Sequence, residues 1–476
     1  MTRYAEGLDR PPRLADRRAR ARFGWADVIG PIAIGTLVFA TFLWVKDEGL
    51  ASLTTVDSAL GSLGSLTGLL ASDLMLIQVV MLARIPWVER AWGHDLLARR
   101  HKWAGYASFW LMIVHLLMFT TQRLTRAGGW NSATIYELFV QEPWLLAATV
   151  GTGLLIMVVV TSIRAARRRL RYESWHLLHL YAYLGMGLAL PHQIIDGEDF
   201  HQTFNRAYWW SIYAVAAAAL LVYRVGLPIW RSVYHAVRVV EVTRENDETV
   251  SVTVQGRQLD RMRTRSGQFF IWRFLDGPGW SRGNPYTISA APGTDRLRVT
   301  VQAAGDGSER TGRLRPGTRV FLEGPYGSMT AERRSHPRVL LMAAGVGITP
   351  IRALLEDMPY APGEATLVYR YSHAGDAVLT REIDAIAARR GVDVRYLPGP
   401  RRAEGSWLPR GADGADSTNG ANGARDDADG LTRIVPDVPD RDIFVCGPPA
   451  WIKAVSRAAR AAGADREQIH TEDFAW

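Results

Sequence analysis

The apolar residues of this 476-residue chain are concentrated in its first half, where long runs alternate with short polar loops. Six runs cover residues 26–45, 59–85, 103–121, 143–163, 176–195 and 207–229. About 20 apolar helical residues span the roughly 30 Å hydrocarbon core of a bilayer, so each run is long enough, or nearly so, to cross a membrane. The pattern predicts a six-helix transmembrane bundle over residues 26–230.

The pattern changes near residue 235 to short β-rich runs separated by glycine and proline turns. These runs lie at 236–243, 249–255, 268–275, 285–290, 296–303 and 319–323. Short strands at such spacing predict an antiparallel β-barrel, which we place at residues 235–335.

A third pattern begins near residue 338, where apolar strands alternate with helices. Strands are expected at 338–343, 365–371, 392–397 and 442–446, and helices at 350–357, 379–390 and 450–461. The alternation predicts a doubly wound α/β domain over residues 336–476. Within it, residues 403–430 are rich in Gly, Ala, Asp and Asn, and we expect a disordered surface loop there. The fold class is therefore multidomain.

Lysine and arginine are distributed unevenly among the loops between the apolar runs. They are frequent before the first run, after the second and after the fourth, and scarce in 46–58 and 196–206. By the positive-inside rule, residues 1–25 form a basic cytoplasmic tail, and both termini of a multi-pass plasma-membrane protein are cytoplasmic. The net charge of +9 arises beside apolar runs, which favours anionic membrane lipid over nucleic acid as its partner.

Four histidines lie in pairs on two predicted spans. His101 and His115 are 14 residues apart and His179 and His192 are 13 apart, so each pair extends roughly 20 Å along a helix. Both spans run outward, which places His101 with His179 near the inner face and His115 with His192 near the outer face. Since imidazole ligates haem iron and ionisable groups in a membrane are costly, the pairs predict axial ligands for two haems.

Two features of the fifth span bear on this prediction. Thirteen residues rotate an ideal helix by about 140°, so we expect the span to bend or unwind at Gly185, Gly187 or Pro191. His176 competes with His179 as the inner ligand. The alternative for any single histidine is a hydrogen-bonding role between helices.

Three motifs in the second half carry candidate chemistry. Residues 284–289 (NPYTIS) place an aromatic ring beside a hydroxyl, which suits flavin binding but also occurs in ordinary strands. Residues 344–350 (AGVGITP) follow a strand and open a helix, where glycine amides can bind a pyrophosphate. Residues 445–449 (VCGPP) end a late strand, and Cys446 is either a small buried residue or a neighbour of a nicotinamide. As the single cysteine, Cys446 also excludes an intrachain disulfide and an all-cysteine iron–sulfur cluster.

Taken in order, these motifs resemble the ferredoxin–NADP reductase superfamily. Joined to a six-span, four-histidine membrane domain, they resemble the ferric reductase and NADPH oxidase group over about residues 30–476. The resemblance rests on the paired histidines, NPYTIS, GPYG at 324–327, GVGITP, CGPP and a terminal aromatic residue.

The resemblance implies a set of cofactor contacts. FAD would be bound by Asn284, Pro285, Tyr286, Thr287, Ser289, Gly305, Gly307, Ser308, Thr311 and Tyr326. NAD(P) would be bound by Gly345, Gly347, Thr349, Pro350, Arg370, Ser372, Cys446, Gly447 and Pro448. Catalytic roles fall to Thr287, Cys446 and Trp476, the last as the aromatic cover of the flavin, with Phe474 as its alternative.

The chain departs from the family pattern at the flavin phosphate. Many soluble relatives carry arginine where this chain has Asn284, and Arg282 is the candidate substitute. Arg370 and Ser372 follow the second strand of the nucleotide domain, and no acidic residue ends that strand, which favours NADPH over NADH.

The function implied is an NAD(P)H-dependent membrane oxidoreductase. Electrons would pass from NADPH (or NADH) through FAD and two b-type haems to an acceptor outside, either ferric iron or dioxygen. Two alternatives are a cytochrome b subunit that passes electrons to a partner redox protein and a redox-sensing proton channel. The sequence leaves the acceptor and the oligomeric state open.

Overall fold

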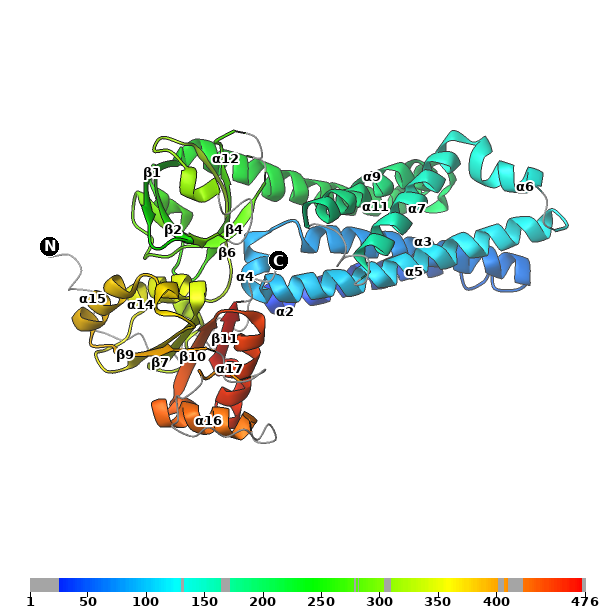
Figure 1. Ribbon diagram of the computed structural model, residues 1–476. Helices are drawn as coiled ribbons and strands as arrows, with labels where there is room; N and C mark the ends of the chain where they lie inside the picture. Colours follow the sequence, from blue (N-terminus) through cyan, green and yellow to red (C-terminus); the bar gives the residue numbers. More distant parts are fainter. Residues whose placement is uncertain are drawn as a thin grey trace. The chain divides into compact units, whose positions relative to one another are not determined.

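The computed structural model describes residues 25–129, 132–163, 172–277, 280, 282–303, 310–400, 406–409 and 423–472. The chain divides into two compact units, whose described residues begin at 25 and at 226 (Figure 1).

The first unit is helical. Its α-helices are α2 (Trp25–Lys46), α3 (Val56–Met81), α4 (Pro86–Trp92), α5 (His94–Arg126), α6 (Ser132–Tyr136), α7 (Pro143–Ser162), α9 (Tyr172–Asp196), α10 (Glu198–His201) and α11 (Thr203–Ala219). Two π-helical segments, η1 (Glu137–Gln141) and η2 (Leu220–Gly226), accompany them.

Five helices in the described residues are long and apolar enough to cross a membrane. They are Val28–Lys46, Val56–Met81, Leu96–Arg126, Pro143–Ser162 and Thr203–His235. Five of the six predicted spans are thus confirmed by length and composition. The remaining one, α9, forms where it was expected but is not among the five. Its histidines and its terminal acidic residues lower its hydropathy.

Glycines bring the helices of this unit together in two pairs, α3 with α5 and α7 with α9 (Figure 1). A Cβ at Gly64 would come within 2.8 Å of the Phe119 ring, and one at Gly68 would overlap the imidazole of His115. A Cβ at Gly151 would lie 2.6 Å from the Gly185 carbonyl oxygen. Small residues allow such close backbone approach in membranes, where burial of apolar surface drives little association.

Helix α9 is continuous, so of the predicted bend or unwinding, the unwinding does not occur. Residues 172–196 are helical throughout, including Gly185, Gly187 and Pro191. Gly185 serves instead in the packing against α7. Pro191 removes one backbone hydrogen bond inside the helix, which allows a bend directly before His192.

The second unit begins with α12 (Leu227–His235) and two three-stranded antiparallel sheets. One has the order β1 (Arg238–Arg244), β2 (Thr249–Gln255), β5 (Arg296–Gln302), and the other β4 (Asn284–Thr287), β3 (Phe269–Phe274), β6 (Val320–Tyr326). Isolated bridges join Arg238 to Arg319 and Ile288 to Val299. All six strands form where they were predicted, but the described ladders are two sheets and not one closed barrel.

The inward-facing side chains of these strands form a single core. Val252, Val254 and Val299 come from one sheet and Phe270 and Trp272 from the other, and all five are fully buried. Along β5, the core residues Leu297, Val299 and Val301 occupy every second position, as expected of side chains on one face of a strand.

The remainder of the second unit is a parallel sheet in the order β11-β10-β7-β8-β9. Its strands are β7 (Arg338–Ala344), β8 (Ala365–Tyr371), β9 (Asp393–Pro398), β10 (Arg441–Cys446) and β11 (Ile469–Glu472). Its helices are α14 (Ile348–Asp357), α15 (Thr380–Arg390), α16 (Gly423–Ile434) and α17 (Pro449–Ala461).

This sheet is covered on both faces, as the predicted doubly wound domain requires. Along β7, Leu341 packs in one apolar cluster with residues of α14 and α15. The adjacent Leu340 and Met342 pack in a second cluster with residues of α16 and α17. Successive side chains of a strand point to opposite faces, so β7, which is buried from Val339 to Ala344, supplies both cores.

The expectation of a disordered loop at 403–430 is wrong at both of its ends. Helix α16 begins at Gly423, and Trp407 is fully buried with its indole nitrogen 2.9 Å from the Asp427 carbonyl oxygen. The Trp451 indole in turn donates to the Trp407 carbonyl oxygen at 3.1 Å. A Gly- and Asp-rich composition conceals the apolar positions of α16, of which Leu431 is fully buried. Residues 410–422 lie outside the described residues.

We predict that Leu431→Ala destabilises the second unit, since it leaves a cavity beneath α16. The expected cost is about 2–5 kcal/mol, seen as a lower thermal unfolding midpoint of the purified chain. Thr432→Ala is the matched control, because Thr432 is the exposed neighbour of Leu431 on the same helix. Equal midpoints for the two variants would show that α16 is not packed.

Candidate functional site

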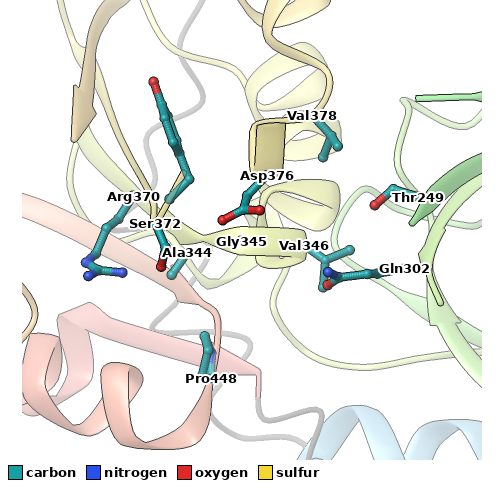
Figure 2. A pocket seen from close by; sticks show the side chains of 11 residues that line it. Thr249, Gln302, Ala344, Gly345, Val346, Arg370, Ser372, Asp376, Val378 and Pro448 are labelled. Carbon is teal, nitrogen blue, oxygen red and sulfur yellow. The ribbon is translucent and has the colours of Figure 1, made fainter. Parts of the chain in front are cut away.

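A cavity of about 230 Å³ lies at the carboxyl ends of β7 and β8 (Figure 2). Four of the predicted NAD(P) residues line it, namely Gly345, Arg370, Ser372 and Pro448. Figure 2 shows Arg370 and Ser372 on one side and Thr249 and Gln302, from the antiparallel sheet, on the other. The carboxyl edge of a parallel sheet is where doubly wound domains bind nucleotides.

The two glycines of the predicted pyrophosphate loop are required for different reasons. Gly345 has a φ of 54°, which is left-handed, and an added Cβ there would meet no atom within 4 Å. Gly347 has an ordinary φ, but its Cβ would overlap the carbonyl oxygen of Cys446. The loop therefore fits against the end of β10, and α14 begins directly after it at Ile348.

The two predicted nucleotide motifs meet at this edge because β7 and β10 are neighbours. Cys446 is paired with Ala343, and a Cβ on Gly447 would lie 3.0 Å from the Cβ of Ala344. Cys446 itself is fully buried in the apolar cluster beneath α14 and α15. Its backbone lies at the edge of the pocket, and its catalytic role stays a prediction.

The predicted flavin residues 284–287 form β4, which is paired with β3. Burial raises the pKa of Tyr286 to about 12, against the opposing effect of a hydrogen bond with Thr311. Its hydroxyl is therefore neutral at physiological pH. The hydroxyl oxygen of Thr287 is buried and has no hydrogen-bond partner in the described residues. A buried hydroxyl of this kind fits a bound group that offers a hydrogen bond.

A second, smaller cavity adjoins β4. Asn284 and Thr311 line it together with Asp276, Trp280, Arg282, Arg310 and two apolar residues. Arg282, the expected substitute for the missing phosphate-binding arginine, lines this cavity, and its role stays a prediction. Arg310 adds a second cation, which is 2.6 Å from Asp276. These cations and the indole fit a nucleotide diphosphate.

Two other predicted flavin residues take part in buried hydrogen bonds. Ser289 is fully buried, and its hydroxyl accepts from Thr300 at 2.8 Å and from Arg298 at 3.2 Å. The Tyr326 hydroxyl donates to Glu323 at 3.2 Å. The predicted contacts Gly305, Gly307, Ser308 and Trp476, and the alternative Phe474, lie outside the described residues.

The structure also adds residues that the motifs did not identify. Thr249, Gln302 and Asp376 line the nucleotide pocket, and Trp280 and Arg310 line the cavity beside β4. Arg310 follows closely on the glycine-rich run at 305–308, which was a usable signal. Thr249 and Gln302 lie at strand ends without a motif, so only the pairing of β2 with β5 identifies them.

In the helical unit, the histidines face one another in the predicted combinations. The ring centres of His101 and His179 are 6.0 Å apart, and those of His115 and His192 are 6.3 Å apart. The backbones of α5 and α9, which carry them, are not closely packed in the described residues. The imidazoles therefore meet across a space between two glycine-packed helix pairs.

Hydrogen bonds orient the two α5 histidines. Nδ1 of His101 donates to the Gln78 carbonyl oxygen at 3.2 Å, and Nδ1 of His115 donates to that of Gly64 at 2.8 Å. Because a carbonyl oxygen only accepts, each Nδ1 carries the proton and each Nε2 has a free lone pair. Metal-bound histidines are oriented in this way. On α9, Nδ1 of His179 is 3.3 Å from the Ser162 hydroxyl.

These separations fit a metal ion held between two imidazoles. Metal–nitrogen bonds of about 2.0–2.1 Å on opposite sides of one ion place the ring centres roughly 6.3 Å apart. No group of three or more metal-binding side chains occurs in the described residues. A haem iron needs only two protein ligands, since the porphyrin supplies the rest.

Two family models match the chain. One, for the ferric reductase like transmembrane component, matches residues 67–190. The other, for an oxidoreductase NAD-binding domain, matches residues 341–457.

Relatives of known function match part of the chain. Ferredoxin–NADP reductase B of Sorangium cellulosum is 30% identical over 204 residues, which are 41% of this chain and 80% of that protein. The ferredoxin reductase component of 3-ketosteroid-9-alpha-monooxygenase from Mycolicibacterium smegmatis is 27% identical over 243 residues, or 50% of this chain. The chain spans 63% of the length of that relative.

Among solved structures, the flavohem-like FAD/NAD binding domain of nitric oxide dioxygenase from Vibrio cholerae matches half of the chain. It is 21% identical, and the match covers 50% of this chain and 98% of that domain with a TM-score of 0.38.

We predict that Gly347→Ala weakens nucleotide binding, because the added methyl group displaces the loop from the end of β10. The Kd for NADP⁺, measured by titration of the purified chain, should rise about tenfold or more, a change of roughly 1.4 kcal/mol. Gly375→Ala is the control, since a Cβ at Gly375 meets nothing within 4 Å. An unchanged Kd in Gly347→Ala would contradict the placement of the loop.

Proposed function

The chain belongs to the ferredoxin–NADP reductase family and carries a ferric reductase-like transmembrane component, and from this premise we propose that it conducts electrons across the plasma membrane. The protein is an NAD(P)H-dependent oxidoreductase. In the proposed function, electrons pass from cytoplasmic NAD(P)H, through FAD and two b-type haems, to ferric iron or dioxygen outside. The observation that carries the proposal is that four imidazoles face one another in two pairs. The ring centres are 6.0 Å apart in one pair, His101 and His179, and 6.3 Å apart in the other, His115 and His192.

The cofactors would supply the redox chemistry. When bound, FAD would take a hydride, which is two electrons and one proton, from the nicotinamide, and would release the electrons singly to haem iron. The contribution of the chain is to bind these groups and to orient them.

The residues of the second unit suit that task. Tyr286 and Thr287 would hold the flavin ring, and Arg282 and Arg310 would neutralise its phosphates. At the carboxyl edge of the parallel sheet, Gly345 and the amides at the start of α14 would hold the pyrophosphate of NAD(P). Gly347 allows that loop to approach the end of β10, where the backbone of Cys446, Gly447 and Pro448 would border the nicotinamide.

The histidines of the first unit suit two haems at different depths. His101 and His179 would ligate the inner iron, and His115 and His192 the outer iron. With an imidazole from each helix as its ligands, each iron would have no open position for dioxygen, which favours electron transfer alone. Helix α9 would complete a six-helix bundle as its fifth span, and the arginine-rich loops support a cytoplasmic location of both termini.

We predict that removal of a single ligand removes a single haem. The wild-type chain should hold two haems, and His101→Ala or His179→Ala should hold one, as counted by the pyridine haemochrome method. His176→Ala is the control, since it leaves the four facing imidazoles unchanged. Two haems in His179→Ala and one in His176→Ala would reassign the inner ligand. A wild-type chain without haem would refute the electron route and leave the proton-channel alternative.

We also predict that Arg370 determines the preference for NADPH. Its guanidinium is nearly buried beside Ser372 in the pocket, where it would bind the 2′-phosphate. In Arg370→Gln, the KM for NADPH should rise about tenfold while the KM for NADH changes little. Arg395→Gln removes an exposed arginine of the adjacent strand and serves as the control. Equal changes for both nucleotides would exclude a phosphate contact.

A further inference from the structure

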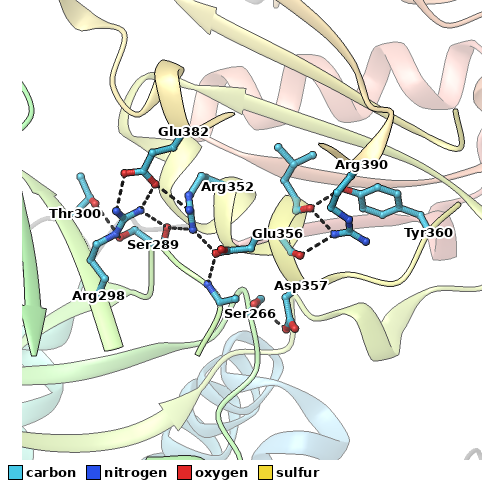
Figure 3. Close-up of polar contacts among 12 residues, drawn as sticks. Ser266, Ser289, Arg298, Thr300, Arg352, Glu356, Asp357, Tyr360, Glu382 and Arg390 are labelled. Atoms are coloured by element: carbon cyan, nitrogen blue, oxygen red, sulfur yellow. Dashed lines mark hydrogen bonds and ion pairs between the residues drawn. The ribbon is translucent and has the colours of Figure 1, made fainter. Parts of the chain in front are cut away.

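A charged cluster joins the antiparallel sheets of the second unit to its parallel-sheet domain (Figure 3). Arg298 belongs to β5, Arg352 to α14 and Glu382 to α15. The two terminal nitrogens of Arg298 donate to the two carboxylate oxygens of Glu382 at 2.7 and 2.8 Å. Arg352 donates to the same carboxylate at 2.9 Å. One carboxylate thus bridges an arginine from each part of the unit.

The same arginines hold the chain segment that follows the flavin strand. The carbonyl oxygen of Ser289, two residues beyond β4, accepts from Arg298 at 3.1 Å and from Arg352 at 3.3 Å. The backbone amide of Ala291 donates to Glu356 of α14 at 2.8 Å, and Glu356 also pairs with Arg352. Helix α14 is therefore hydrogen-bonded directly to the segment that follows β4, at Ser289 and Ala291.

Burial strengthens the ion pairs of Glu382 with Arg298 and Arg352, and it makes the loss of the Glu382 carboxylate costly. The side chains of Arg352, Arg298 and Glu382 are 8%, 17% and 34% exposed. Bidentate arginine–carboxylate pairs are charge-assisted and geometrically specific. Loss of the carboxylate would leave two largely buried guanidinium groups without their shared acceptor, which is costly.

Helix α14 therefore connects the two proposed cofactor sites. Its first residues follow Gly345 and Gly347, which form the nucleotide loop, and its later residues Arg352 and Glu356 hold the segment after β4. A rotation of the parallel-sheet domain against β4 would break the contacts of Glu382 and those of Ser289 together. The nucleotide loop can keep its own shape in such a rotation, because it is packed against β10.

We propose that Glu382 is a positioning residue that fixes the nucleotide-binding sheet against the flavin strand and so sets the distance for hydride transfer from NAD(P)H. The inference rests on the proposed function, because it presumes that β4 holds the flavin. Misplacement of reacting atoms by about 1 Å can lower a rate on the order of 100-fold. Glu382 lines neither of the two cavities and acts through the arginines.

The ionisation of Glu382 allows the bridge to persist over the physiological range. Burial alone would raise the pKa of Glu382, but its hydrogen bonds to Arg298 and the charges of Arg298 and Arg352 hold the pKa below its usual value. A carboxyl group with a lowered pKa stabilises the folded form above its unfolded pKa, and this contribution is lost as the pH falls through the folded value. The bridge should therefore weaken only in acid.

The test compares Glu382→Gln with the wild-type full-length chain, purified in detergent with FAD bound. Anaerobic stopped-flow absorbance measures flavin reduction by NADPH, and titration measures the Kd for NADP⁺. We expect the reduction rate to fall at least about tenfold, while the Kd changes by less than about threefold and the FAD content stays the same. Asp393→Asn, which removes the carboxylate of an exposed pair on β9, should leave all three unchanged.

Arg298→Gln removes the partner of Glu382 on the antiparallel sheet and should also lower the rate of flavin reduction. If Glu382 acts through Arg298, the double variant should be little slower than the slower single variant. Spin labels at Thr243→Cys and Ala385→Cys, both exposed in the wild type, give a readout independent of turnover. The native cysteine is buried, so labelling should be confined to the added sites. The distance distribution between the labels should broaden in Glu382→Gln.

The outcomes separate this inference from the proposed function. A wild-type chain that binds FAD but is reduced by neither NADPH nor NADH would refute the proposed function. A wild-type chain that is reduced, with an equal rate and an equally narrow distance distribution in Glu382→Gln, would refute the positioning role alone. A raised Kd with an unchanged limiting rate would assign Glu382 to nucleotide binding instead and would also overturn the inference.

Discussion

The hydrogen bond from a buried imidazole to a backbone carbonyl is the interaction on which the helical unit depends. A hydrocarbon interior offers no water, so each ring nitrogen of a membrane histidine needs a partner. His101 and His115 obtain one from the carbonyls of Gln78 and Gly64 on the neighbouring helix. This fixes the proton on Nδ1 and leaves the lone pair of Nε2 available to a ligand. The close approach of α3 to α5, which Gly64 and Gly68 permit, is what brings those carbonyls within reach.

In the second unit, the groups that must be held in position are two proposed cofactor sites. These two sites lie on different sheets, and hydride transfer requires a fixed distance and orientation between them. Buried apolar clusters stabilise each sheet, but apolar contacts alone are not directional. The charged cluster around Glu382 is directional, since bidentate pairs demand one geometry. It meets α14, the helix that also begins at the nucleotide loop.

Features that depend on the local sequence pattern were predicted from the sequence, whereas side-chain contacts such as those of Arg298 with Glu382 were not. Strands β1 to β10 and the facing histidines follow from periodicity, spacing and charge asymmetry. Helix α16 was missed because Gly and Asp dominate its composition, although Trp407 and Leu431 are buried beside it. Of the bend or unwinding expected in α9, the unwinding does not occur, since ideal helix rotation ignores how far a histidine side chain reaches. Arg298 and Glu382 are 84 residues apart, and no motif connects them.

In the proposed function, two pairs of imidazoles would each hold one iron between them. The electron paramagnetic resonance spectrum of the oxidised full-length chain tests it most directly, because it reports the axial ligands of each haem. We predict low-spin ferric signals from two haems and no high-spin component. A high-spin signal from a haem with an open axial position, or a chain that contains no iron, would contradict it.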